Sequence, residues 1–228
     1  MNPFSLRTPR TRPARVLCLG AHSDDIEIGC AGTLLTLLRG DIDTEVEWVV
    51  FGAQGAREAE ARRAAEIVLV GACRSDVSVL GFPDSYFPYE GGAIKRQFEA
   101  IKTRFTPDLI FTHRGDDRHQ DHRVISELTW NTFRDHTILE YEIPKYDGDL
   151  GQPNVFVPVD DEARSRKLDV LMDVFHTQRD KRWFTRETFE GLMRLRGIES
   201  AASTGFAEGF HARKIVLDLA APPAGTSE

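Results

Sequence analysis

The chain has 228 residues, enough for one domain with a sizeable core, and its 41% hydrophobic and 29% charged residues are ordinary for a globular protein. Its formal net charge of −7 argues against nucleic acid or an anionic membrane surface as the main partner. No apolar stretch approaches the roughly 20 residues that cross a bilayer, so we expect no membrane span. Three cysteines without metal-ligand spacing predict reduced thiols in a cytoplasmic protein.

Strands and helices alternate through the first two thirds of the chain. Short apolar and β-branched runs predict strands, and apolar residues at helical spacing predict helices. In chain order we predict strand 14–19, helix 32–38, strand 45–51, helix 57–70, strand 77–80, helix 94–105, strand 109–112, helix 121–133 and strand 138–143. This order predicts an α/β fold in which helices cover both faces of a mostly parallel sheet.

The last third has a different pattern. Its Gly, Pro, Asp and Asn content predicts a long ordered loop, which two helices and a final strand or hairpin follow. In chain order these are loop 144–158, helix 161–176, helix 188–196 and strand or hairpin 207–219. Residues 1–13 and 220–228 are expected to be flexible tails, which leaves one domain over residues 14–219.

Two polar clusters follow predicted strands. Ala21-His22-Ser23-Asp24-Asp25 comes directly after the first strand, and His119-Gln120-Asp121-His122 comes after the fourth. Ligands of open α/β sheets bind at the carboxyl ends of the strands. We therefore expect both clusters to contribute to one site, at that edge of the sheet.

The residue types of the clusters suit a catalytic metal. Zinc binds imidazole nitrogen and carboxylate oxygen, and a catalytic site keeps one position open for water. His22 and Asp25 lie three residues apart, and either His119 or His122 offers a third ligand. We expect one Zn²⁺ per chain, with iron, cobalt or manganese as other ions that fit these ligands.

The remaining groups of the clusters suit proton transfer. Asp24 lies beside the candidate ligands and is free to take a proton from water. The histidine that is not a ligand can stabilise an oxyanion and protonate a leaving amine, while Asp121 orients it. In a simpler interpretation, Asp24 and Asp25 cap a helix and both histidines are solvated residues of a polar turn. The conjunction of two clusters at one sheet edge favours the metal site.

These residues resemble a known family, the LmbE-like or PIG-L zinc deacetylases. Residues 21–25 are close to its Ala-His-Pro-Asp-Asp signature, and residues 119–122 are similar to its His-Pro-Asp-His motif. Order, spacing and strand context also match over residues 14–145, the implied core, with residues 146–219 as a C-terminal extension. The resemblance implies a Rossmann-like fold and removal of acetyl groups from N-acetylglucosamine units on varied carriers.

The resemblance also implies a role for individual residues. It makes His22, Asp25 and His122 the zinc ligands. It makes Asp24 the general base and His119 the oxyanion-stabilising acid, with Asp121 in support.

Two further positions are implied as substrate contacts. Arg57 begins a predicted helix and Asp84 lies in a Gly-Phe-Pro-Asp loop; alternatively they are an exposed helix residue and a turn former. Ser23 and Gln120 replace the prolines of the two signatures. Neither position is a ligand or an acid–base group, so the expected chemistry is retained and the carrier stays open.

The sequence leaves the roles of a polar loop and of one histidine near the C-terminus open. Residues 139–149 are either a wall of the substrate pocket or a structural loop. His211 is either a late contributor to the site or a packed or surface residue.

We expect a metal-dependent hydrolase that removes the N-acetyl group from an amino sugar and releases acetate. Its partner would be a small-molecule N-acetyl amino sugar or a conjugate of one; the sequence leaves a homo-oligomer open. The alternatives are a metal-dependent hydrolase of another amide or of a phosphoester, and a non-catalytic sugar- or nucleotide-binding protein. A dinucleotide dehydrogenase is disfavoured, because the first strand–helix turn lacks GxGxxG.

Overall fold

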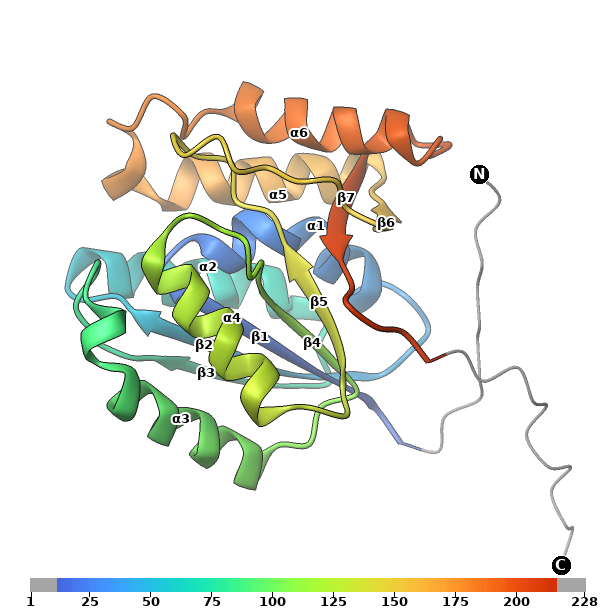
Figure 1. Cartoon of the computed structure of the whole chain (residues 1–228). Coiled ribbons are helices and arrows are strands. Elements are labelled where there is room, and N and C mark those ends of the chain that lie inside the picture. The colour runs from blue at the N-terminus through green and yellow to red at the C-terminus, as the bar shows by residue number, and fades with distance from the viewer. Residues whose placement is uncertain (1–11, 217–228) are drawn as a thin grey trace, which may run out of the picture.

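A seven-stranded mixed sheet forms the centre of the molecule (Figure 1). The structure, a computed structural model, describes residues 12–216. In chain order the strands are β1 (Ala14–His22), β2 (Thr44–Gly52), β3 (Arg74–Val79), β4 (Leu109–His113), β5 (Thr137–Tyr141), β6 (Val155–Pro158) and β7 (Ala207–His211). Their order across the sheet is β3-β2-β1-β4-β5-β7-β6. The first five strands are parallel, whereas β7 runs antiparallel to β5 and β6.

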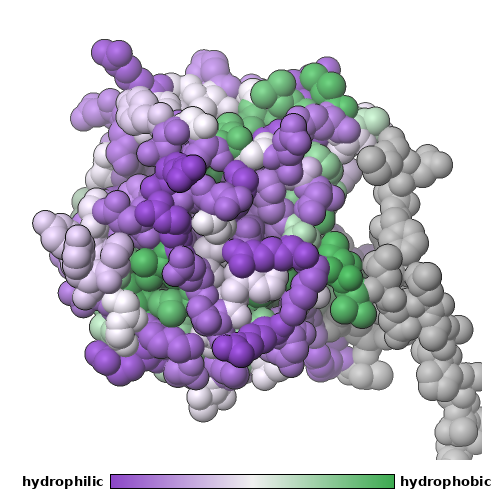
Figure 2. Space-filling view, in the orientation of Figure 1, coloured by the Kyte–Doolittle hydropathy of each residue, from purple (hydrophilic) through white to green (hydrophobic). Residues whose placement is uncertain are grey.

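Helices cover both faces of this sheet, as the sequence predicts. In chain order they are α1 (Asp25–Leu38), α2 (Ala56–Val68), α3 (Gly91–Arg104), α4 (Gln120–Thr132), α5 (Asp161–Val174) and α6 (Arg186–Glu199). Helices α3 and α4 pack on one face, while α1 and α2 pack on the other under an outer layer of α5 and α6 (Figure 1). The outer surface over α3 and α4 is mostly hydrophilic (Figure 2). In the part of the chain described, no helix is both long and apolar enough to cross a membrane.

Strand β1 shows why an apolar run takes this central position. Every residue from Val16 to His22 is buried. Successive side chains of a strand point to opposite faces, so Val16 and Cys18 join the core under α1 while Leu17 and Leu19 join the core under α3. A strand that is buried on both faces needs a continuous apolar sequence rather than an alternating one.

The predicted elements are present, and three differences in extent are the largest. Helix α1 begins at Asp25, seven residues before the predicted start, where the Asp25 carboxylate lies in the first turn, at the positive end of the helix dipole. The predicted loop 144–158 ends in β6, which pairs with β7. The last strand ends at His211. The predicted tails lie outside the described residues except for Arg12 and Pro13, and so do residues 217–219.

A close approach between α1 and β5 requires Gly29. A Cβ atom at this position would lie 2.3 Å from Cδ2 of the buried Tyr141 ring. We expect Gly29→Ala to lower the free energy of unfolding by about 1–3 kcal/mol, measured by urea denaturation, because the added methyl overpacks the interface. Gly191→Ala in α6 is the control, since a Cβ there meets nothing within 4 Å. Equal stability of Gly29→Ala and the parent protein would contradict this account.

Candidate functional site

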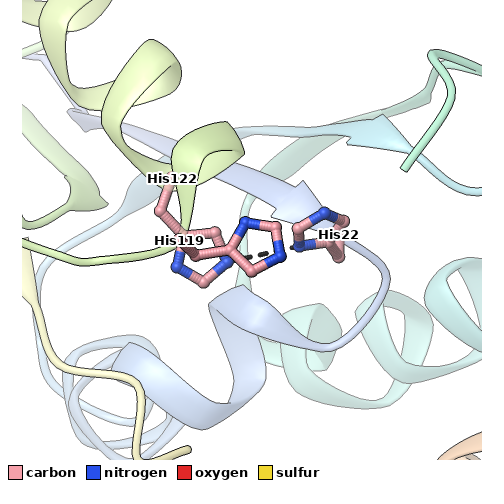
Figure 3. Close-up of side chains that lie close together, drawn as sticks. All are labelled: His22, His119 and His122. Carbon is pink, nitrogen blue, oxygen red and sulfur yellow. Dashed lines mark hydrogen bonds between the residues drawn. The ribbon is translucent and has the colours of Figure 1, made fainter. Parts of the chain in front are cut away.

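The two polar clusters meet at the carboxyl ends of β1 and β4, which are neighbours in the sheet. His22 ends β1 and Asp25 begins α1, whereas His122 lies in the first turn of α4. The imidazoles of His22, His119 and His122 lie close together, with the first two contributed from opposite sides of the site (Figure 3). His22, Asp25 and His122 are all buried.

The donor atoms of three predicted ligands lie at distances that suit one metal ion. His122 Nε2 lies 3.2 Å from His22 Nδ1. The Asp25 carboxylate oxygens Oδ2 and Oδ1 lie 3.4 Å from His22 Nδ1 and 3.5 Å from His122 Nε2, respectively. Ligands about 2.0–2.1 Å from a tetrahedral zinc ion are about 3.3–3.4 Å apart. The residues present therefore fit such an ion.

Other donors lie near the same centre. Ligand atoms of His22, His119 and His122 lie within 4.8 Å of one another, and so do those of Asp25, His113 and His122. A third group of possible ligands consists of His22, Asp84, His119 and Asp121. In it, Nε2 of His22 faces the two carboxylates. The cluster can thus bind a metal, with more donors than one ion needs.

In both His22 and His122, a carboxylate contacts the ring nitrogen that does not face the other histidine. Asp121 Oδ2 lies 3.1 Å from His22 Nε2, and Asp117 Oδ2 lies 2.9 Å from His122 Nδ1. A histidine that donates its far N–H to a carboxylate keeps the lone pair of the other nitrogen free for a metal. Burial, the largest cause, lowers the pKa of His122 to about 3, which favours this neutral form. Burial also opposes the charge of His22, but the carboxylates of Asp121 and Asp25 raise its pKa well above the usual range, so a metal there would replace a proton.

Asp24 has the environment of a proton acceptor. Its carboxyl is buried, and Ser23 Oγ donates to Oδ1 at 3.4 Å. Burial first, and the charge of Asp25 second, raise the pKa of Asp24 to about 6, against the opposing charges of Lys181 and Arg57. A carboxylate with that pKa takes up a proton readily near neutral pH.

His119 caps helix α4 and reaches the same space. Its Nδ1 accepts a hydrogen bond from the Asp121 backbone N–H at 3.3 Å. Its ring stacks on His122 with centroids 4.6 Å apart and meets His22 edge-on at 4.9 Å. Burial, followed by the charge of His22, lowers the pKa of His119.

The fully buried Asp121 carboxylate holds the loop that follows β3. It accepts hydrogen bonds from Ser85 N at 2.6 Å and Phe87 N at 3.1 Å, besides its contact with His22. Ser85 has a φ of 70°, a left-handed conformation that these contacts sustain. In this structure Asp121 reaches His119 through its backbone N–H.

Arg57 and Asp84, the two implied substrate contacts, lie at the edge of the site. Arg57 Nη1 donates to Asp84 Oδ2 at 2.8 Å, and Asp84 Oδ1 lies 3.3 Å from His22 Nε2. Their side chains are 27% and 44% exposed, respectively. The pair therefore presents a donor and an acceptor to solvent beside the buried histidines.

Two residues that touch this centre, His113 and Asp117, were not singled out from the sequence, and neither was Lys145, which contacts Asp117. His113 is fully buried at the end of β4, where Nε2 accepts from Ala21 N at 2.9 Å and lies 3.2 Å from Asp25 Oδ2. Asp117 and Lys145 lie behind His122. The position of His113 at a strand end was an available signal, because β4 was expected to lead into the second cluster.

The roles of the loop of residues 139–149 and of His211 were left open by the sequence, and the structure shows where they lie. Residues 147–151 form one wall of a polar groove of about 460 Å³, with residues 114–118 and Arg123 on the other wall. His211 Nε2 lies 3.8 Å from Glu142 Oε1 at the β5–β7 pair.

Comparison with known proteins now identifies the family. A sequence profile described as PIG-L: GlcNAc-PI de-N-acetylase matches residues 17–133, a range that contains both polar clusters. The chain belongs to the PIG-L family. It is thus an enzyme of the zinc-dependent deacetylase class, as the two signatures predicted.

Individual relatives differ in activity. The uncharacterized deacetylase YaiS of Escherichia coli K12 is 29% identical over 167 residues, which cover 68% of this chain and 88% of the relative. N,N'-diacetylchitobiose deacetylase from Pyrococcus horikoshii is 18% identical, with a TM-score of 0.64 over 92% of this chain and 87% of its own. GalB, a 4-carboxy-2-hydroxymuconate hydratase from Pseudomonas putida KT2440, is 17% identical, with a TM-score of 0.67 over 91% of this chain and 100% of its own. Because one fold carries both activities, the reaction must be argued from the site.

Proposed function

We propose that this enzyme hydrolyses the N-acetyl group of an amino sugar, in a sugar nucleotide, a glycoside or a glycan precursor, and releases acetate. The ion would be one Zn²⁺ per chain, held by His22, Asp25 and His122. The observation that carries this ligand set is the spacing of 3.2–3.5 Å among their three buried donor positions. Family membership supports the reaction class.

The residues around that centre have complementary roles in the proposal. A bound zinc ion supplies Lewis-acid polarisation of the acetamide carbonyl and lowers the pKa of the attacking water. Asp24 accepts the proton of that water at its carboxylate. In the proposal His119 is protonated when substrate is bound: it donates a hydrogen bond to the oxyanion and then its proton to the departing amine, and the proton that Asp24 took from the water then passes to His119.

The remaining residues orient the substrate and the ligands. Arg57 and Asp84 hydrogen-bond to the sugar from the edge of the site, where their side chains are exposed to solvent. Asp121 keeps His22 oriented and fixes the backbone on which Asp84 lies. Burial of Asp24, His22 and His122 excludes bulk water, which strengthens the charged contacts among them.

The test is a mass-spectrometric screen of N-acetyl sugars, sugar nucleotides and glycosides for loss of acetyl, with the zinc content of the protein measured alongside. We expect at least one N-acetyl sugar to release acetate, the activity to be lost with a chelator and restored by zinc, and one zinc per chain. A zinc-loaded protein that releases no acetate across the panel would overturn the proposal.

Metal stoichiometry also separates the deacetylase from a dinuclear phosphoesterase. The grouping of Asp84, His119 and Asp121 at the far edge of His22 is the feature that favours this alternative. Two ions would lie about 3.5–4 Å apart in a dinuclear site. Two zinc ions per chain, together with hydrolysis of a phosphoester, would favour it.

A further inference from the structure

Lys145 is a buried cation in the loop after β5, and the function proposed above gives it no role. Its side chain is only 8% exposed. Burying a lysine is costly unless carboxylates compensate its charge. Here two do: Nζ lies 3.0 Å from Asp117 Oδ1 and donates to Asp149 Oδ2 at 2.6 Å.

Asp117 connects this lysine to the proposed metal ligand. Its Oδ2 lies 2.9 Å from His122 Nδ1, while Oδ1 accepts from His119 N at 2.8 Å and faces Lys145. Each oxygen thus has a fixed partner, and the carboxylate cannot rotate without losing contacts on both sides. The side chain is 5% exposed, so water would not readily replace them.

Asp149 is the second carboxylate that Lys145 contacts. Besides the contact with Lys145, its Oδ2 accepts from Arg118 N at 2.7 Å, and its carbonyl oxygen accepts from Arg114 Nη1 at 2.9 Å. The loop of residues 144–150 is thereby fastened to the segment of residues 114–119. Without the lysine charge, the buried carboxylates of Asp117 and Asp149 would repel each other across this junction.

We propose that Lys145 is a positioning residue that fixes the orientation of His122 through Asp117, and so fastens the 144–150 loop to the metal site. The inference rests on the proposed function, because it takes His122 as a ligand. Held by Asp117, His122 keeps its proton on Nδ1 and presents Nε2 toward His22. The same contacts fix residues 147–149 in the wall of the polar groove.

The experiment measures the zinc dissociation constant of the whole protein by competition with a chromophoric chelator, without substrate. We expect Lys145→Met to raise this constant about tenfold, the lower end of the effect of losing a residue that orients a ligand. Lys145→Arg should recover most of the affinity, because a guanidinium also bridges two carboxylates. The control is Arg63→Met, which removes the exposed partner of Glu66 and should leave zinc affinity unchanged.

A double variant separates positioning from general destabilisation. Lys145→Met with Asp149→Asn removes the repulsion between Asp117 and Asp149, so stability in urea should recover while zinc affinity stays low. A folded Lys145→Met protein with the parent zinc affinity would overturn the inference. So would a double variant in which zinc affinity returns together with stability. A parent protein that binds no zinc would instead overturn the proposed function.

Discussion

Asp24→Asn is expected to lower kcat by a factor of about 10²–10⁴, the range by which a general base accelerates a reaction. The amide is nearly the same shape as the carboxylate but cannot accept the proton of the attacking water. Steady-state kinetics on a substrate found in the screen would measure the effect. Because Asp24 is proposed as the base and not as a ligand, zinc content should stay at one ion per chain.

Two comparisons make the Asp24 result specific. KM should change little, since an interaction made only in the transition state affects kcat rather than binding. Asp173→Asn is the control: it removes an exposed carboxylate of α5 and should keep the parent kcat. A zinc-loaded Asp24→Asn enzyme with the parent turnover would show that another group takes the proton.

Lys167→Met is expected to lower the free energy of unfolding by about 3–5 kcal/mol, the cost of breaking a buried ion pair from one side. Lys167 Nζ donates to Glu208 Oε1 and to the Ile28 carbonyl, both at 2.6 Å, and the two charged side chains are each 3% exposed. Glu208 also accepts from the backbone N–H groups of Gly32 and Thr33 in α1. The substitution therefore leaves a buried carboxylate without its cation. Urea denaturation gives the measurement.

A second substitution tests that explanation of the Lys167 effect. Glu208→Gln in the Lys167→Met background removes the uncompensated charge and should recover part of the stability. The exposed pair of Arg63 and Glu66 supplies the contrast, because breaking a surface ion pair costs no more than about 1 kcal/mol. If the free energy of unfolding of Lys167→Met lay within about 1 kcal/mol of the parent value, the Lys167–Glu208 pair would contribute little to stability.

Local sequence predicts the central sheet well because burial there imposes a pattern on consecutive residues. The run from Val16 to Leu19 is apolar throughout, since both faces of β1 are covered. The start of α1 is harder to predict, because Asp24 and Asp25 interrupt the apolar pattern at the site. Strand β6 was assigned to a loop for a different reason: it is four residues long and depends on pairing with β7, about 50 residues later.

Some residues of the candidate site can likewise be identified from local sequence, and others cannot. His22, Asp25 and His122 lie in two short signatures, so adjacent residues were enough to single them out. Asp117 and Lys145 are ordinary charged residues in polar segments, and their importance comes from a junction that joins positions 28 residues apart. No local pattern marks such a junction. His113 lies between the two cases, because its place at the end of β4 pointed to the correct edge of the sheet.

Two buried polar junctions are among the contacts by which later parts of the chain hold the segment that carries both signatures. Lys145 contacts Asp117 behind His122, and Lys167 and Glu208 together hold the backbone of α1. A chimaera that kept residues 12–133 and took the remainder from a relative would need matching charges at these three positions. Exchange of loops during evolution or design is therefore restricted at a few charged positions, while the exposed surface between them is free to change with the substrate.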